Sequence, residues 1–166
     1  MIAAVVLAAG ASTRFGSPKQ AILLEPILER VRSSHAIGDI VVVLGAHDVE
    51  STARSVHCPE WQRGPGASLR CGLGALGDEA RAAVVVLADG PSLDPRAIDR
   101  VVAAWRESGS ERVAATYAGI RLHPLLLARN AWTDVPDEGL RDLPADLVPC
   151  DDLDPPGDVD FADDSS

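Results

Sequence analysis

Residues 1–20 read MIAAVVLAAGASTRFGSPKQ, and they are the most informative part of the chain. Ile2–Ala8 is a continuous apolar run, which predicts a β-strand that is buried on both faces, as in a parallel sheet. The segment after this strand is rich in Gly, Ser and Thr and carries Arg14 and Lys19. Small residues let the backbone approach a ligand closely, and turns in such segments can direct N–H groups at anions. The stretch therefore predicts a strand followed by an anion-binding loop, with an ordinary strand-to-helix turn as the alternative.

Apolar runs and amphipathic segments alternate along the rest of the chain, which favours an α/β protein. Further strands are predicted at Ile40–Leu44, Ala82–Ala88, Arg112–Tyr117, Pro124–Leu127 and Leu147–Cys150. Helices are predicted at Glu25–His35, Asp48–Val56, Ala67–Leu76, after the N-cap residue Asp94, and at Gly139–Leu143. This order predicts one domain over residues 1–166, with a three-layer, doubly wound, mostly parallel, Rossmann-like sheet. Because ligands of such sheets bind beyond the carboxyl ends of the strands, the first loop and Asp89 should meet at one site.

The composition limits the kinds of partner that we expect. The chain has 166 residues, 46% of them hydrophobic and 24% charged, and a net charge of -10, which is typical of one globular domain. Binding nucleic acid requires basic surface, so a nucleic acid is not expected as a partner. No apolar run approaches the roughly 18 to 20 residues that span a bilayer, so we expect no membrane partner and a cytoplasmic location. Residues 151–166 hold seven Asp and no Lys or Arg, a composition that is also typical of a solubilising tail.

Two residue types are informative through their counts. The chain has 14 Arg but a single Lys, Lys19, which favours a site that needs a compact ammonium group. The three cysteines, Cys58, Cys71 and Cys150, are odd in number and lack CxxC spacing. This pattern predicts three reduced, packed thiols, and it argues against both a disulfide framework and a zinc site.

The first loop carries a resemblance to a known family. Its pattern, LAAGxSxRxGxxK, resembles the N-terminal motif of the MobA-like nucleotidyltransferases, and more specifically that of the molybdenum cofactor cytidylyltransferases. The resemblance implies a GT-A-like nucleotidyltransferase fold and enzymatic transfer of a nucleotidyl group. Relatives that use GTP tend to have Gly in place of Ala9, so the motif favours CTP. The nucleotide-binding residues implied by this motif are Leu7, Ala8, Ala9, Gly10, Ser12, Arg14 and Lys19.

Two further segments resemble motifs of the same family. Residues 64–73 resemble GxxxSLRxGL, which implies that Gly66 and Ser68 border the pocket for the base. The N–H groups at a helix N-terminus are free to bind ligands, which agrees with that role, although Ser68 could equally cap the helix. The segment LADGP resembles the strand end that carries a metal-binding Asp in the family, which implies that Asp89 binds Mg²⁺. Carboxylate oxygens suit Mg²⁺, whereas an Asp after a strand also commonly caps a loop.

Shorter matches lie in the second half of the chain. Residues 158–164 resemble the C-terminal DIDTPED of the family, with Phe-Ala in place of Thr-Pro. The match implies Asp160 as a second Mg²⁺ ligand, with Asp158 as the alternative. His123 belongs to an HP dipeptide that, by resemblance, lies on the acceptor-binding side, although a lone His before a strand is as often structural. Residues 137–141 resemble a GDxGxR segment, for which we expect a role in an acceptor loop.

Together these resemblances imply Mg²⁺-dependent transfer of a nucleoside monophosphate, with CMP favoured, from a nucleoside triphosphate to a phosphorylated acceptor such as molybdopterin. Pyrophosphate would be released, and Arg14, Lys19 and Asp89 would be the catalytic residues. One alternative is a nucleotidyltransferase that acts on a sugar or polyol phosphate, or that uses GTP. Another is a nucleotide-binding regulatory protein without catalysis. The altered C-terminal motif motivates it, as do loops near 24–25 and 132–138 that are shorter than those of the family.

Overall fold

The structure is a computed structural model, and it describes residues 1–9, 18–46 and 48–157. Its strands are β1 (Ile2–Ala8), β2 (Ile37–Leu44), β3 (Arg54–His57), β4 (Ala82–Leu87), β5 (Arg112–Tyr117), β6 (Ile120–Ala128) and β7 (Asp146–Pro149). Its helices are α1 (Pro18–Arg32), α2 (Pro65–Gly74) and α3 (Pro95–Ser108), with 3₁₀ turns η1 (Trp61–Arg63) and η2 (Arg129–Ala131).

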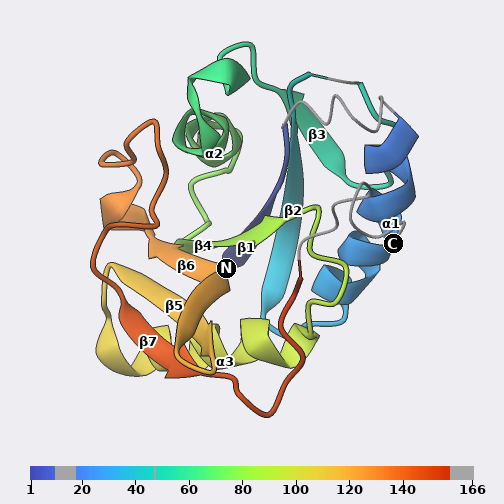
Figure 1. Cartoon of the computed structure of the whole chain (residues 1–166). Coiled ribbons are helices and arrows are strands. Elements are labelled where there is room, and N and C mark those ends of the chain that lie inside the picture. The colour runs from blue at the N-terminus through green and yellow to red at the C-terminus, as the bar shows by residue number, and fades with distance from the viewer. Residues whose placement is uncertain (10–17, 47, 158–166) are drawn as a thin grey trace.

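Within the described residues, the strands form one seven-stranded sheet in the order β3-β2-β1-β4-β6-β5-β7. Only β6 is antiparallel to its neighbours, β4 and β5, and the remaining pairs are parallel. The sheet is twisted, and β1 lies inside it between β2 and β4 (Figure 1). This topology confirms the prediction of a mostly parallel α/β sheet.

Helices cover both faces of the sheet, which gives the three predicted layers. Alternate residues of β1 point to opposite faces: Ala4 and Val6 contact one core, whereas Ala3 and Val5 contact the other. Helices α1 and α3 cover the first core, and α2 covers the second with the segment around residues 135–140 (Figure 1). The apolar residues of β1 are therefore buried on both faces, as the continuous apolar run predicts.

Helix α3 begins as predicted. The side chain of Asp94 accepts a hydrogen bond from the N–H of Arg96 at 2.9 Å, and Pro95 occupies the first helical position. Leu93, just before the cap, and Ile98, in the second turn, are both fully buried. This arrangement is the hydrophobic contact that commonly sets the angle at which a chain enters a helix.

Two of the predicted helices are wrong in position or in kind. Helix α1 begins at Pro18 and not at Glu25, because proline is favoured at a helix start and because Leu24, before Pro26, is already buried on the apolar face. The segment 48–56 is not a helix: its end forms β3, which pairs in parallel with β2. The exposed edge of β2 offers unpaired backbone groups that β3 satisfies.

The predicted helical turn at Gly139–Leu143 is also wrong, since this segment contains only turns. Gly139 has a positive φ of 98°, which interrupts a right-handed helix. The carbonyl oxygens of Leu140 and Leu143 accept hydrogen bonds from the guanidinium of Arg121 at 3.0 and 2.6 Å. A side chain from β6 therefore holds this turn, in which the N–H of Leu143 also donates to the carbonyl oxygen of Leu140 at 3.1 Å.

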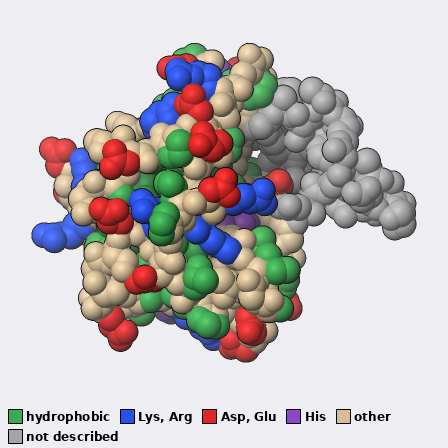
Figure 2. Space-filling view, turned by 60° about the vertical axis from the view of Figure 1, so that its left-hand side comes forward, with side chains coloured by type: hydrophobic (Ala, Val, Ile, Leu, Met, Phe, Trp, Pro, Cys, Tyr) green, Lys and Arg blue, Asp and Glu red, His purple; other side chains and the backbone are tan. Residues whose placement is uncertain are grey.

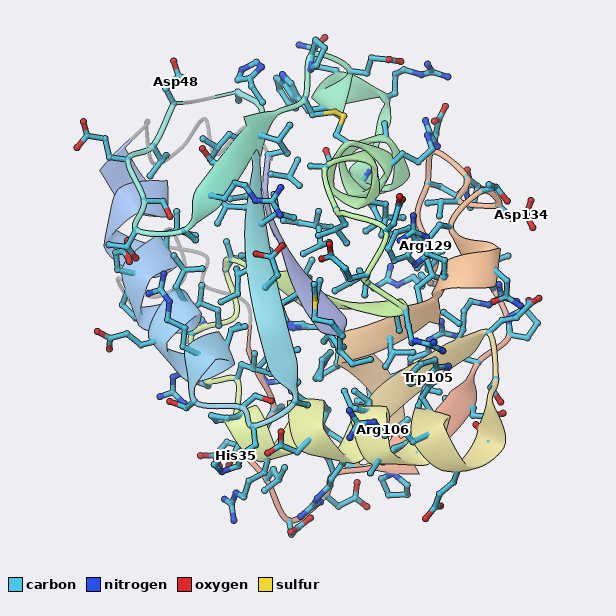
Figure 3. All side chains as sticks on the ribbon, turned by 180° about the vertical axis from the view of Figure 1, so that it is seen from behind. His35, Asp48, Trp105, Arg106, Arg129 and Asp134 are labelled. Carbon is cyan, nitrogen blue, oxygen red and sulfur yellow. A yellow bond between two sulfur atoms is a disulfide. The ribbon has the colours of Figure 1, made fainter. Side chains whose placement is uncertain are left out.

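The cysteine prediction is wrong for two of the three residues. Cys58, directly after β3, and Cys71, in α2, form a disulfide with a Cα–Cα distance of 5.8 Å, and the bond lies beside α2 in Figure 3. Cys150 is a free, buried thiol, as expected. The connection through η1 folds α2 back towards the end of β3. Two cysteines that are thirteen residues apart in the sequence therefore come into direct contact. An odd count of cysteines carries no information about such a contact.

Among residues 1–9, 18–46 and 48–157, no helix is both long and apolar enough to cross a membrane. Acidic and basic side chains lie interspersed on the face shown in Figure 2.

Candidate active site

The candidate site lies at the carboxyl ends of β1 and β4. These strands are parallel neighbours, with Leu7 opposite Leu87, and the N–H of Ala88 donates to the carbonyl oxygen of Leu7 at 3.0 Å. The chain leaves β1 through Ala9 and leaves β4 through Asp89, at the same edge of the sheet. The prediction that the first loop and Asp89 meet at one edge is therefore confirmed up to Ala9, where the described part of the loop ends.

Several of the predicted site residues lie outside the described residues. Gly10, Ser12 and Arg14 belong to this group, as do Asp158 and Asp160. Lys19 occupies the first turn of α1, and its side chain is not among those described. The roles of these residues stay predictions.

The turn after β4 presents a carboxylate and receives the C-terminal segment. Asp89 is exposed, whereas Gly90 is buried and its N–H donates to the carbonyl oxygen of Leu87 at 3.1 Å. The N–H of Ser92 donates to the carbonyl oxygen of Pro156 at 3.0 Å, and a Cβ on Gly90 would lie 3.1 Å from Pro156 Cβ. Pro156 lies two residues before the acidic residues 158–164, which are outside the described part of the chain, so the described chain ends close to the Asp89 turn.

The described donor set at this turn fits a magnesium ion that is held largely by its substrate. Among the described residues, no group of three His, Cys, Asp or Glu side chains could hold a metal ion. In enzymes that act on nucleotides, Mg²⁺ is commonly bound by one or two carboxylates, and phosphates and waters complete its coordination shell. The exposed Asp89, which follows the end of β4, is compatible with that arrangement.

His123 lies beneath this turn. Its side chain is 8% exposed, and its Nδ1 accepts a long hydrogen bond from the N–H of Leu87, with an N–N distance of 3.5 Å. Its Nε2 is buried and has no hydrogen-bond partner among the described residues, and a Cβ on Gly90 would lie only 2.6 Å from that atom. Burial lowers the pKa of His123 from 6.5 to about 4, so the imidazole is neutral at pH 7.

The buried imidazole makes the stability of the fold depend on pH. Because the pKa of His123 is lower in the folded chain than in the unfolded chain, the full stability is present above pH 6.5 and is lost as the pH falls towards 4. We expect the free energy of unfolding to be about 2 kcal/mol lower at pH 5 than at pH 8 from this group alone. Urea unfolding of the wild-type chain and of His123→Gln at both pH values measures this contribution. Equal pH dependence in the two proteins would contradict it.

The N-terminus of α2 is not free, which corrects one premise of the sequence interpretation. The N–H of Gly66 donates to the carbonyl oxygen of Asp137 at 2.8 Å, and Ser68 is 4% exposed. A Cβ on Gly66 would lie 1.6 Å from the carbonyl oxygen of Pro136, so this contact requires glycine. The backbone of residues 136–137 therefore occupies the donor that was expected to face a ligand. The roles of Gly66 and Ser68 in nucleotide binding stay predictions.

Side chains reinforce this contact, which the sequence interpretation missed. Arg70 donates to the carbonyl oxygen of Val135 at 2.6 Å and also to the carboxylate of Asp137, which Arg63 contacts at 3.2 Å. The hydrogen bond from Arg70 and the charge of Arg63 lower the pKa of Asp137. Arg70 therefore links α2 to the segment around Asp137, where the sequence alone indicated only a charged surface residue. The two segments are 67 residues apart, and only the resemblance of 137–141 to an acceptor-loop motif pointed to them.

Comparisons with known proteins agree with this geometry. The family model for the MobA-like NTP transferase domain matches residues 4–146 of the sequence. Rv0371c from Mycobacterium tuberculosis H37Rv is 26% identical over 99% of this chain and 96% of that chain, with a TM-score of 0.78. Its homologue from Mycobacterium sp. strain JC1 is also 26% identical, over 99% and 92% of the two chains, with a TM-score of 0.79. No curated protein matches the chain.

A further match concerns a structure with a metal ion. The complex of Rv0371c from Mycobacterium tuberculosis H37Rv with manganese is 24% identical over 99% of this chain and 95% of that chain, with a TM-score of 0.73. The sheet and its helical layers are those of a nucleotidyltransferase with a GT-A-like fold, as predicted.

Proposed function

Since this chain belongs to the family of MobA-like NTP transferases, we propose that it transfers a nucleoside monophosphate, CMP in preference, to a phosphorylated acceptor such as molybdopterin. Pyrophosphate is the second product. The nucleotidyltransferase activity follows from the family, whereas the choice of CTP and of acceptor is our proposal. It rests on Ala9, which stands where relatives that use GTP tend to have Gly, and on the motifs that the chain shares with the cytidylyltransferases.

The observation that best supports the proposal is the convergence of three segments at one sheet edge. The end of β1 leads towards the Gly-rich loop, the end of β4 carries Asp89, and Pro156, two residues before the acidic C-terminal motif, lies against Gly90. These segments lie far apart in the sequence, and each carries one of the predicted motifs. Open α/β sheets also bind their ligands just beyond the carboxyl ends of their parallel strands.

The proposed roles follow from the charge of the reaction. The phosphate oxygen of the acceptor attacks the α-phosphorus of the nucleotide, and the bond to pyrophosphate breaks. Lys19 and Arg14 stabilise the negative charge that develops on the phosphates, while the loop from Leu7 to Ser12 holds the nucleotide. Asp89 and Asp160 would hold Mg²⁺, which neutralises phosphate charge when bound. A phosphate nucleophile is already anionic at neutral pH, so the reaction needs no general base from the protein.

Release of pyrophosphate tests the proposal directly. The purified chain is incubated with Mg²⁺, molybdopterin and each of CTP, GTP, ATP and UTP, and pyrophosphate is measured. We expect release with CTP that depends on molybdopterin. Release with GTP, or with a sugar or polyol phosphate in place of molybdopterin, would assign the chain to another branch of the family. Binding of a nucleotide without release of pyrophosphate with any of these acceptors would favour the regulatory alternative, which the Phe-Ala replacement in the C-terminal motif motivates.

Asp89→Asn is expected to raise the Mg²⁺ concentration for half-maximal activity by about tenfold, because it removes the charge of a metal ligand and keeps its size. A magnesium titration of the pyrophosphate release measures this change. Asp78→Asn is the matched control: it removes the same charge from a fully exposed residue before the amino end of β4. If the two variants have the same magnesium dependence as the wild-type chain, Asp89 does not bind the metal.

A further inference from the structure

His123 lies where the pairing of β4 with β6 ends, next to the turn that carries the candidate metal ligand Asp89. The antiparallel pairing of β4 with β6 runs from Ala82 opposite Ala128 to Val85 opposite Leu125 and stops there. The next residue of β6 is Pro124, which has no N–H to donate to the ladder. Had the register continued, His123 would lie opposite Leu87.

The side chain of His123 replaces the missing ladder contact. The N–H of Leu87, the last residue of β4, donates to Nδ1 of the imidazole and not to a backbone carbonyl of β6. The carbonyl oxygen of His123 accepts instead from the hydroxyl of Tyr117 on β5, at 3.1 Å. Tyr117 on β5 therefore holds the backbone of His123, and the imidazole ring carries the contact to the end of β4.

The other side of the ring supports the turn itself. Since Nδ1 accepts a hydrogen bond, the proton of the neutral imidazole lies on Nε2. That nitrogen is buried against Gly90, where a Cβ would come within 2.6 Å of Nε2 and 2.8 Å of Cε1. Only glycine lets the turn rest on the ring. A buried donor without a hydrogen-bond partner among the described residues destabilises the fold, so this histidine lowers the stability of the chain.

We propose that His123 is a positioning residue that sets the Asp89–Gly90 turn, and through it the carboxylate of Asp89, for the metal–nucleotide complex. The inference rests on the proposed function, since it assumes that Asp89 binds the metal. This role differs from the acceptor contact that the resemblance implied, and it is argued from the burial of the ring below Gly90.

Manganese binding in the presence of CTP, followed by electron paramagnetic resonance, provides a readout that is independent of turnover. His123→Phe keeps a ring of similar size but removes both nitrogens, so we expect the affinity for manganese to fall about tenfold, as for other residues that orient a metal ligand. His123→Asn places an amide where Nδ1 lies and is expected to recover part of the loss. The KM for the acceptor should stay unchanged in both variants.

Gly90→Ala tests the same contact without altering the histidine. The added methyl group meets the ring, so we expect it also to weaken manganese binding about tenfold. Gly74→Ala is the control, because nothing lies within 4 Å of its added Cβ. Unchanged manganese affinity in folded His123→Phe and Gly90→Ala overturns the inference, as does a raised acceptor KM with unchanged metal affinity. If the wild-type chain binds no manganese with any nucleotide, the proposed function fails as well.

Discussion

Lys19→Ala is expected to lower turnover by a factor of about 10² to 10³ while leaving the fold intact. Removal of a single group that stabilises charge in a transition state commonly has an effect of this size. Lys19 is the only lysine among 15 basic residues, and it lies in the motif that the family uses for the triphosphate. Its place in the first turn of α1, a helix that follows the loop after β1, puts it on the chain segment that leaves the candidate site. Steady-state kinetics of pyrophosphate release measures the loss.

Two further variants separate the charge of Lys19 from its shape. Lys19→Arg keeps the positive charge in a larger, planar group, and we expect it to recover only part of the activity. Arg106→Ala removes one positive charge from an exposed position near the end of α3 and should leave turnover unchanged. If Lys19→Ala turned over like the wild-type chain, Lys19 would have no catalytic role and the assignment of the loop would be wrong.

Gly66→Ala is expected to have the largest effect on stability. The new methyl carbon would lie 1.6 Å from the carbonyl oxygen of Pro136 and 2.7 Å from its carbonyl carbon. Neither belongs to a flexible side chain, so the backbone of residues 135–137 must move away from α2. Such a movement breaks the hydrogen bond between Gly66 and Asp137 and the contacts of Arg70. We expect a loss of about 3 kcal/mol in the free energy of unfolding, the upper end of the usual range for overpacking.

The same helix offers a matched control. Gly74→Ala adds an identical methyl group to α2 at a position where nothing lies within 4 Å. Because alanine favours a helix over glycine, this variant should be neutral or more stable by about 0.5 kcal/mol. Differential scanning calorimetry should show a midpoint that is roughly 10 °C lower for Gly66→Ala than for the wild-type chain. Equal midpoints for the two variants would mean that residues 135–137 do not rest on Gly66.

The central strands of the sheet could be predicted because each of them is a continuous apolar run in the sequence. Ile2–Ala8 and Ala82–Leu87 are apolar at nearly every position, which only a strand with helices on both sides requires. The start of α3 could also be predicted from neighbouring residues alone, since Asp followed by Pro before an apolar stripe is a typical helix start. The meeting of β1 with the Asp89 turn followed from topology, because parallel strands end at one edge of a sheet.

What could not be predicted depends on contacts between distant segments. Residues 48–56 lack a clear pattern, and the free edge of β2 rather than local propensity makes their end a strand. The contact of Asp137 with Arg70 joins segments that no spacing connects, as does the bond of Cys58 to Cys71. His123 was assigned to the acceptor side by resemblance, whereas its position under Gly90 follows from the end of the β4–β6 ladder. Contacts of this kind can be identified only in the three-dimensional structure.

Nucleotide binding tests the central claim most directly, and a thermal-shift panel of CTP, GTP, ATP and UTP, each with and without Mg²⁺, measures it. A ligand at 100 times its Kd stabilises a folded protein by about 2.7 kcal/mol, which corresponds to roughly 5 to 10 °C for a chain of this size. We predict such a shift with CTP and Mg²⁺, a smaller one with CTP alone, and a much reduced one for Lys19→Ala. The absence of a shift with any of the four nucleotides, with or without Mg²⁺, would contradict a nucleotide site at this edge of the sheet.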